Sequence, residues 1–357
     1  MASRDINTSS NFTKTGISQP VIINFSFGLA GCILNGLVCL IIATHKSLRQ
    51  PFNHLILNLS LSDFFVSLSV ILYGLSNYLA VYQSANNLSI TVADILCKLD
   101  VFCILASISA ACLTLSIISI ERYQAIAILR LHKMKLSTTR KIILIIWILA
   151  SIPAAIPAYF SRIDANLYHS CHLNQMDNFF LTVFCVILFC LTCFLPVIFM
   201  LLLYGIITHK LWITTRITPS TVSQVASKRK RYLRRSVIAI LGISLFSSGT
   251  ALPYLVFSII LIIGQHYDSE FKLIFIAKNE LIWSISTYLF ILTPILNPLL
   301  YNLASSQFRE VLYHLLNSHD CKFLARTRRR TNTVPIQRTT TIRTLTTKPS
   351  HQLTAVD

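Results

Sequence analysis

The sequence predicts an all-α membrane protein, a seven-transmembrane helix bundle with its N-terminus outside the cell and its C-terminus inside. Of the 357 residues, 54% are hydrophobic and only 12% are charged, whereas a typical soluble domain carries about 25% charged residues. A soluble fold could not bury so much apolar surface, so we expect lipid to be the main solvent. One membrane domain then accounts for a length that would otherwise suggest two soluble domains.

Seven apolar stretches are long enough to cross a bilayer. A hydrocarbon core about 30 Å thick requires roughly 20 residues of helix at 1.5 Å per residue. Lipid offers the backbone no hydrogen-bond partner, so each stretch is expected to be helical. The stretches cover residues 20–44, 52–80, 94–126, 141–160, 178–208, 236–264 and 273–303.

The distribution of Lys and Arg sets the orientation and explains the net charge of +18. Six of the 31 basic residues fall in segments predicted to lie outside, and 25 fall on the opposite side. Such an excess marks the cytoplasmic face, where basic residues also meet anionic lipid headgroups. We therefore expect membrane lipids, and no nucleic acid, among the partners. Only the basic patch at residues 228–235 is a candidate for contact with a protein partner. The six outer residues are Arg4, Lys14, Lys98, Arg162, Lys272 and Lys278.

The predicted domains are an extracellular tail (1–19), a membrane domain (20–303), an amphipathic interfacial helix (304–316) and a basic, Thr-rich, disordered cytoplasmic tail (317–357). The first tail lacks the apolar core of a signal peptide. The interfacial helix follows from an apolar stripe at i, i+3, i+4 and i+7, and the disorder from the scarcity of large apolar residues. The stripe consists of Phe308, Val311, Leu312 and Leu315.

Three sequons and one cysteine are candidates for modification. Asn7 and Asn11 begin sequons in the first tail, and Asn87 begins a third in a predicted external loop. All three are therefore expected to be glycosylated. Cys321, just beyond the interfacial helix, is a candidate for palmitoylation, with a free cytosolic thiol as the alternative.

Asp63 lies deep within the second apolar stretch. A charge in hydrocarbon costs several kcal/mol unless it is paired or hydrated, so an intramembrane acid is a functional candidate. Asn35 and Asn297, in the first and seventh stretches, offer amide partners for it. Pro294 and Pro298 each remove a backbone donor beside Asn297 and loosen that helix. The patch predicts either a site for a cation or proton, or a hinge.

Cys97 and Arg122 mark the two ends of the third stretch. They are 25 residues apart, about 37 Å of helix. Arg122 follows Glu121, which offers a charge pair that can be exchanged for another partner, although a simple topology anchor is the alternative. Apart from Cys97, only Cys171 among the ten cysteines falls in a predicted external loop. The outer compartment is oxidising, so we predict a Cys97–Cys171 disulfide.

Taken in order along residues 20 to 316, these positions resemble the rhodopsin-like (class A) G-protein-coupled receptors. The matching pieces are Asn35-Gly36, Leu59-Ser60-Leu61-Ser62-Asp63, Cys97, Glu121-Arg122-Tyr123, Trp147, Cys171, Pro196 with Tyr204, Pro253, and Asn297-Pro298-Leu299-Leu300-Tyr301 followed by Phe308.

The resemblance implies a plasma-membrane receptor that responds to an extracellular ligand. Ligand binding would favour an outward swing of the sixth helix, in which Arg122 leaves Glu121 and helps to expose a cleft for a heterotrimeric G protein. The Thr-rich tail would be phosphorylated by a receptor kinase and bind arrestin. The residues implied in coupling and activation are Glu121, Arg122, Tyr123, Tyr204, Asn297, Pro298 and Tyr301.

The resemblance also implies a sodium ion at Asp63, with Asn35 and Asn297, as an allosteric modulator; no other cofactor or metal is expected. This chain departs from the family pattern at four positions. Ala251 replaces the usual Trp of helix six, Ala111 a common Ser, and Thr293 a common Asn. Leu233 stands where an acid usually holds Arg122, which predicts raised signalling without ligand.

The ligand is expected to be a peptide with a basic residue, with a lipid as the alternative. Ile104 stands where amine receptors have Asp, and Ile291 where opsins have Lys, so both classes are disfavoured. The pocket is expected to be mostly uncharged, with acidic residues near its mouth. Its predicted members are Tyr73, Asn77, Asp100, Ile104, Thr192, Tyr254, Ser258, Trp283 and Thr287.

The alternative function is a small-solute or ion transporter. Transporters often show paired repeats with broken helices and several polar residues near the membrane midplane. This sequence shows one deep acid and no visible repeat. No nucleophile–base pair or metal-binding motif lies in the apolar stretches, so an enzyme is not expected.

Overall fold

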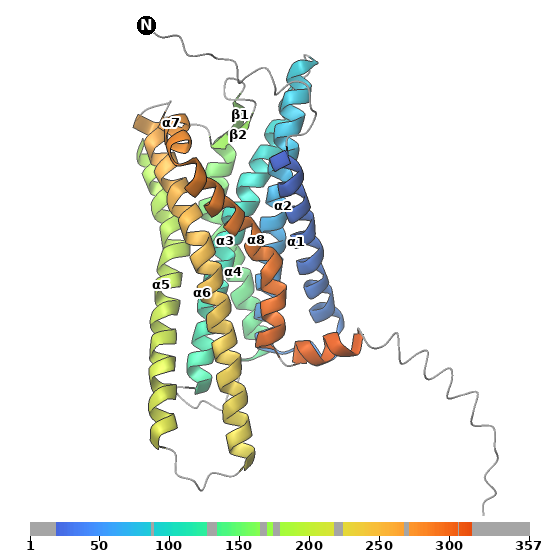
Figure 1. The fold of residues 1–357 in the computed structure, drawn as a ribbon, viewed down its shortest axis with the longest axis vertical. Helices are drawn as coiled ribbons and strands as arrows, with labels where there is room; N and C mark the ends of the chain where they lie inside the picture. The colour runs from blue at the N-terminus through green and yellow to red at the C-terminus, as the bar shows by residue number, and fades with distance from the viewer. Residues whose placement is uncertain are drawn as a thin grey trace, which may run out of the picture. The chain divides into compact units, whose positions relative to one another are not determined.

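A computed structural model of the chain describes residues 19–86, 89–126, 134–164, 170–173, 179–217, 224–267, 271–305 and 307–315. The helices belong to one compact unit that ends at Leu312. Long helices run side by side in this unit, with a short hairpin, β1–β2, at one end (Figure 1). The helices are α1 (Gln19–Thr44), α2 (Pro51–Ala85), α3 (Thr91–Ile126), α4 (Leu136–Phe160), α5 (Phe179–Ile217), α6 (Gln224–Tyr267), α7 (Phe271–Lys278) and α8 (Glu280–Ala304), with a short 3-10 turn, η2 (Lys46–Leu48), after α1.

Seven of the described helices, all except α7, are long and apolar enough to cross a membrane. Their side chains support this. The large apolar residues of α5 that are more than half exposed recur every three or four positions, along one face of the helix. In water such a face would be strongly unfavourable, whereas in a bilayer it is solvated by lipid tails. These residues are Phe180, Phe184, Ile187, Leu191, Leu195 and Ile198, followed by Leu202.

One predicted boundary is wrong. The last apolar stretch, 273–303, does not form a single helix, because α7 ends at Lys278 and α8 begins at Glu280. Asn279 between them has φ −121° and ψ 25°, outside the helical range, and acts as the N-cap of α8. Asn279 lies between two charged residues, Lys278 and Glu280, and an Asn is more favourable at the start of a helix than in its interior. The seventh span is therefore Glu280–Tyr301.

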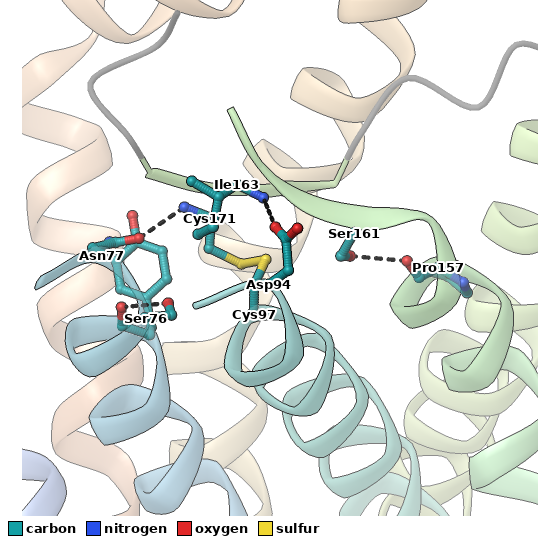
Figure 2. The surroundings of a disulfide bond; sticks show 9 residues. Ser76, Asn77, Asp94, Cys97, Pro157, Ser161, Ile163 and Cys171 are labelled. Carbon is teal, nitrogen blue, oxygen red and sulfur yellow. Dashed lines mark hydrogen bonds between the residues drawn. A yellow bond between two sulfur atoms is a disulfide. The ribbon is translucent and has the colours of Figure 1, made fainter. Parts of the chain in front are cut away.

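The hairpin was not predicted from the sequence. β1 (Ser161–Asp164) and β2 (Ser170–Leu173) pair antiparallel, with Ile163 opposite Cys171. Cys171 forms the predicted disulfide with Cys97 of α3, at a Cα–Cα distance of 5.4 Å. Figure 2 shows two further attachments of the hairpin. The Ile163 backbone N–H donates to the Asp94 carboxylate, and the Cys171 N–H donates to the Asn77 side-chain carbonyl, each at 2.7 Å.

The other end of the bundle, which we call the Arg122 end, is closed by an apolar core contributed by α1, α2, α3, α5, α6 and α8. Tyr204 and Tyr301 are its largest fully buried side chains. The chain is helical again over residues 307–315, and Phe308 is buried in the same core. The predicted amphipathic segment is therefore helical where it is described.

A buried polar junction connects α2, α3 and α4. The Asn58 amide donates to the Thr114 hydroxyl at 2.7 Å, and its carbonyl accepts from the Trp147 indole at 2.8 Å. Each group is paired, so the junction avoids the cost of an unsatisfied polar group in a membrane protein. It fixes α3, which carries Arg122, between its two neighbours.

Candidate functional site

The first part of the site surrounds Asp63, which is 6% exposed. The Asn297 side-chain amide donates to Asp63 Oδ2 at 2.9 Å, and the Tyr301 hydroxyl donates to the same oxygen. The Asn297 carbonyl in turn accepts from the Ser247 hydroxyl at 3.1 Å. A chain of hydrogen bonds therefore joins the middle of α2 to α8 and α6, and it satisfies a carboxylate that could not stand unpaired in the bundle.

Asn35 has a different partner from the expected one. Its amide donates to the Pro294 carbonyl at 2.8 Å rather than to Asp63. In a regular helix the backbone N–H four residues further along would donate to the Pro294 carbonyl. That residue is Pro298, which has no N–H, so the carbonyl is left without its helical partner. Asn35 supplies the missing donor and ties α1 to the loosened part of α8.

A core cavity of about 70 Å³ lies beside Asp63 in the middle of the bundle. Its α3 wall consists of Ile108, Ala111, Cys112 and Leu115, and its α6 wall includes Ala251. The side-chain oxygen atoms come from Asp63 of α2, from Ser247 and Ser248 of α6, and from Asn297 and Thr293 of α8, of which Thr293 shares a 2.6 Å hydrogen bond with Thr250.

The residues around the core cavity do not fit a sodium ion. Alkali and alkaline-earth cations need several oxygen ligands around them. The α3 wall offers no side-chain oxygen because Ala111 takes the place of a Ser. The opposite walls offer few free oxygens: the Asn297 carbonyl already accepts from Ser247, and both hydrogen bonds to Asp63 fall on one carboxylate oxygen, which leaves the other as the free ligand of that side chain.

The second part of the site surrounds Arg122, at the end of α3 away from the disulfide. Arg122 is 9% exposed, and its guanidinium lies 3.4 Å from the Glu121 carboxylate. It also lies over the ring of Phe52, with 3.8 Å between the guanidinium carbon and the ring centroid. The sequence indicated the first contact but not the second, because nothing in a local pattern connects the start of α2 with the end of α3.

Tyr204 of α5 and Tyr123 lie near this pair. The Tyr204 hydroxyl is buried near Ser244 of α6 and in the neighbourhood of Arg122, and it has no hydrogen-bond partner among the described residues. Tyr123 packs against the apolar core of the same end. A cleft of about 580 Å³ lies beside Tyr204 between α5 and α6, with Gly205, Thr208 and Leu245 in its walls.

The third part is an outer cavity of about 150 Å³ between α3, α4, α5 and α6, in the half of the bundle that carries the disulfide. It brings together three predicted pocket residues, Ile104, Tyr254 and Ser258. Tyr254 stacks on Trp283 with 5.7 Å between ring centroids, so Trp283 supports this wall from α8.

The remaining predicted pocket residues lie elsewhere. Thr192 faces Ser109 of α3 at 3.1 Å, and Thr287 donates to a carbonyl of its own helix. Asn77 holds the hairpin, and Tyr73 lies beside it on α2. These four positions are not part of the outer cavity.

Asp100 is buried on α3, with 6% of its surface exposed. Among the described residues, the single ion pair is that of Glu121 with Arg122, so no described cation pairs with Asp100. Lys98, two residues away, lies over the ring of Tyr159 at 5.4 Å. The described neighbours of Asp100 include Tyr73 and Tyr254, with which it interacts electrostatically.

Several predicted sites lie outside the described residues. These are the sequons at Asn7, Asn11 and Asn87, the basic side chains of 228–235 with Leu233, and the tail with Cys321.

Comparisons with known proteins agree with this arrangement. The model of the family described as "7 transmembrane receptor (rhodopsin family)" matches residues 34–301. The chain is 29% identical over 225 residues to Tachykinin-like peptides receptor 86C of Drosophila melanogaster, a match that covers 58% of this chain and only 42% of that receptor. It is 26% identical over 316 residues to Growth hormone secretagogue receptor type 1 of Oryctolagus cuniculus, covering 84% of this chain and 80% of that receptor.

A solved structure shares the fold. The crystal structure of squid rhodopsin superposes with a TM-score of 0.63 and 19% sequence identity, over 89% of this chain and 94% of that chain. At this identity the likeness concerns the fold alone.

Proposed function

Because the chain belongs to the rhodopsin family of seven-transmembrane receptors, we propose that it binds an extracellular peptide and activates a heterotrimeric G protein. The transporter alternative loses its support, since the family match extends over most of the membrane domain. The receptor is not an enzyme, and we place it in the plasma membrane, with the disulfide end outside.

The observation that carries the coupling proposal is the position of Arg122. Its guanidinium is buried at one end of the bundle with a neighbouring carboxylate, a neighbouring ring and the Tyr204 side chain. A charge in such a place is costly unless its contacts compensate, and it can exchange one set of contacts for another of similar energy. We propose that it leaves Glu121 for Tyr204 and Tyr301 when α6 moves outward. The cleft between α5 and α6 would then widen into the binding site for the G protein.

Tyr301 must change partner in this step. It donates to Asp63 in the present arrangement, with Asn297 beside it on the same oxygen. Pro294 and Pro298 leave α8 with missing backbone donors near these two residues, so this part of the helix can bend more readily than a regular helix. We propose that bending here releases Tyr301 toward Arg122.

The test measures nucleotide exchange on a panel of purified heterotrimers, with the receptor in lipid nanodiscs and a library of peptides as ligands. The receptor is expected to accelerate exchange on at least one heterotrimer when an active peptide is added. Arg122→Ala should abolish this acceleration. The control is Arg140→Ala, which removes an exposed Arg at the start of α4. Loss of exchange in the control alone, or unchanged exchange in Arg122→Ala, would contradict the proposal.

A peptide with a basic residue is the favoured ligand. The relative from Drosophila is a receptor for tachykinin-like peptides, and Asp100 of this chain is a buried carboxylate without a described cationic partner. A ligand guanidinium or ammonium would pair with this carboxylate. Such a charge pair contributes more to the binding free energy in a site without water than at the surface. Asp100→Asn is therefore expected to weaken the affinity of the receptor for basic peptides at least about tenfold. Glu280→Gln, which neutralises an exposed carboxylate at the start of α8, should leave that affinity unchanged.

We propose three further partners from the same family membership. Membrane lipids would contact the basic residues of the Arg122 end, and the helix at 307–315 would lie in the inner interface. A receptor kinase would phosphorylate the Thr-rich tail at 317–357, and arrestin would bind the product.

A further inference from the structure

The core cavity has apolar walls on three helices. Leu115 and Cys112 line it from α3, Phe194 from α5, and Leu255 from α6. Interiors of proteins are close-packed, and a void lined by apolar atoms lowers stability because its lining loses contacts. At about 70 Å³ this void exceeds the roughly 10–15 Å³ needed to admit a single water.

The void exists because two facing positions are small. Ala251 lies two residues before the helix-breaking Pro253 of α6, where the family pattern has an indole, and Ala111 lies across from it on α3. Neither alanine fills the space toward Asp63. The substitution of the indole therefore opens room in the centre of the bundle rather than at its surface.

Most of the residues around the cavity are apolar, and its polar members, Asp63, Ser247, Ser248, Thr293 and Asn297, are partly paired with one another. Thr293 is bonded to Thr250, and Asn297 is bonded to both Asp63 and Ser247. A buried water needs two to four polar partners, whereas dry apolar cavities bind benzene or xenon. The chemistry of the walls matches a small uncharged aliphatic or aromatic group.

The core cavity lies next to the outer cavity. Ile108 and Leu255 line both of them, so these two side chains form the partition between the two volumes, and a change of their rotamers would join them. The outer cavity lies in the half of the bundle that carries the disulfide and has a volume of about 150 Å³. A ligand that occupies the outer cavity can extend an apolar end past Ile108 and Leu255.

We propose that the core cavity is a subsite for a small uncharged apolar group, carried at the end of the extracellular ligand and admitted through the outer cavity. The proposal rests on the proposed function only in that the ligand supplies this group. It gives the position of Ala251 a role, because the ligand group would occupy the space of the missing ring and contact α3 and α6 directly.

The experiment measures the melting temperature of the purified receptor in nanodiscs with and without benzene, which stands in for the ligand group. Three proteins are compared: the unchanged receptor, Ala251→Phe, which fills the cavity, and Val256→Phe, which adds the same ring at a position of α6 that is 42% exposed and lines none of the three cavities described above. A molecule that binds only the folded state raises its melting temperature. Benzene dissolved in the lipid acts on all three proteins alike and cancels in the comparison.

The expected result is a benzene-induced rise that the unchanged receptor and Val256→Phe share and that Ala251→Phe lacks. An equal shift in all three proteins would overturn the proposal. Ala111→Leu, which fills the cavity from α3, replaces Ala251→Phe if that variant does not fold. No G protein takes part, so failure of the coupling proposal would leave this result unchanged.

A second comparison tests the source of the group. Peptides that activate nucleotide exchange and end in an aromatic or large aliphatic residue should lose at least tenfold in potency on Ala251→Phe. On Val256→Phe their potency should stay within a factor of two. Equal potency on both variants would show that the ligand does not reach the core cavity.

Discussion

At the scale of single residues, the contact between Arg122 and Phe52 is expected to hold the resting receptor. A cation over an aromatic ring contributes about 1 kcal/mol, and the guanidinium carbon lies 3.8 Å from the Phe52 centroid. The proposed active arrangement gives up this contact. Phe52→Leu, which keeps the apolar bulk and removes the ring, should therefore raise ligand-free nucleotide exchange roughly fivefold.

Two variants make this measurement specific. Phe52→Tyr retains the ring and should keep ligand-free exchange near the original rate. Leu233→Glu restores an acid near the base of α6 and should lower it, which also tests the expectation that its absence raises basal signalling. If Phe52→Leu left the basal rate unchanged, Phe52 would be a packing residue only.

The absence of an oxygen ligand on the α3 wall predicts that sodium does not regulate this receptor. Replacing sodium chloride by choline chloride at constant ionic strength should change basal exchange and peptide affinity by less than about fivefold, the lower end of typical allosteric coupling. The double variant Ala111→Ser with Thr293→Asn should introduce a sodium effect. A large effect in the unchanged receptor would show that the site accepts the ion despite Ala111.

At the scale of elements, the approach of α1 to α2 depends on Gly28. A Cβ added there would lie 2.8 Å from Ile71 Cγ1 and 2.9 Å from the Ser67 backbone oxygen. The carbonyl cannot rotate away, so the helices would have to separate. Gly28→Ala is expected to destabilise the bundle by about 1–3 kcal/mol, measured by thermal unfolding in nanodiscs.

Gly74 of α2 provides the matched control. A Cβ added at this position meets no atom within 4 Å. Gly74→Ala should therefore stabilise the helix by about 0.5–1 kcal/mol, because alanine loses less conformational freedom on folding. Loss of stability in both variants would point to a general intolerance of change rather than to close packing of α1 on α2.

The elements predicted from the sequence were those with a strong local signal. An apolar run of some 20 residues defines a membrane helix by itself, so all seven spans were found. The hairpin was not found because it depends on tertiary contacts, whereas the break at Asn279 has a local signal, the polar residues around it, that the apolar residues on either side obscured. The disulfide, the bonds to Asn77 and Asp94, and the packing of Ile163 against α2 and α3 hold the hairpin in place.

The functional site shows the same difference between residues that carry a local sequence signal and residues that do not. Polar residues in an apolar helix stand out in a sequence, and Asp63 with Asn297 was correctly expected to be a pair. Phe52 and the residues of the α3 wall of the core cavity other than Ala111 are apolar residues in apolar stretches of sequence, so no sequence signal distinguishes them. The partner of Asn35 depends on which backbone carbonyl lacks a donor, and that is known only when the helices are placed together.

At the scale of the whole molecule, two independent features predict the same orientation in the membrane. The Cys97–Cys171 disulfide marks one end, and disulfides persist in oxidising compartments. The opposite end carries exposed basic residues such as Lys46, Arg49 and Arg140, which favour the cytoplasmic side. The hairpin end is therefore expected to face the outside and the Arg122 end the cytoplasm.

This orientation can be measured in cells with one epitope tag at each end of the chain. An antibody should reach the N-terminal tag on intact cells and the C-terminal tag only after permeabilisation. Glycosidase treatment should increase the gel mobility of the receptor, and the joint substitution Asn7→Gln with Asn11→Gln should remove most of that change, because glycans are added only on the outer side. A C-terminal tag exposed on intact cells would place Arg122 outside, where no heterotrimer could reach it, and the coupling proposal would fail together with the orientation.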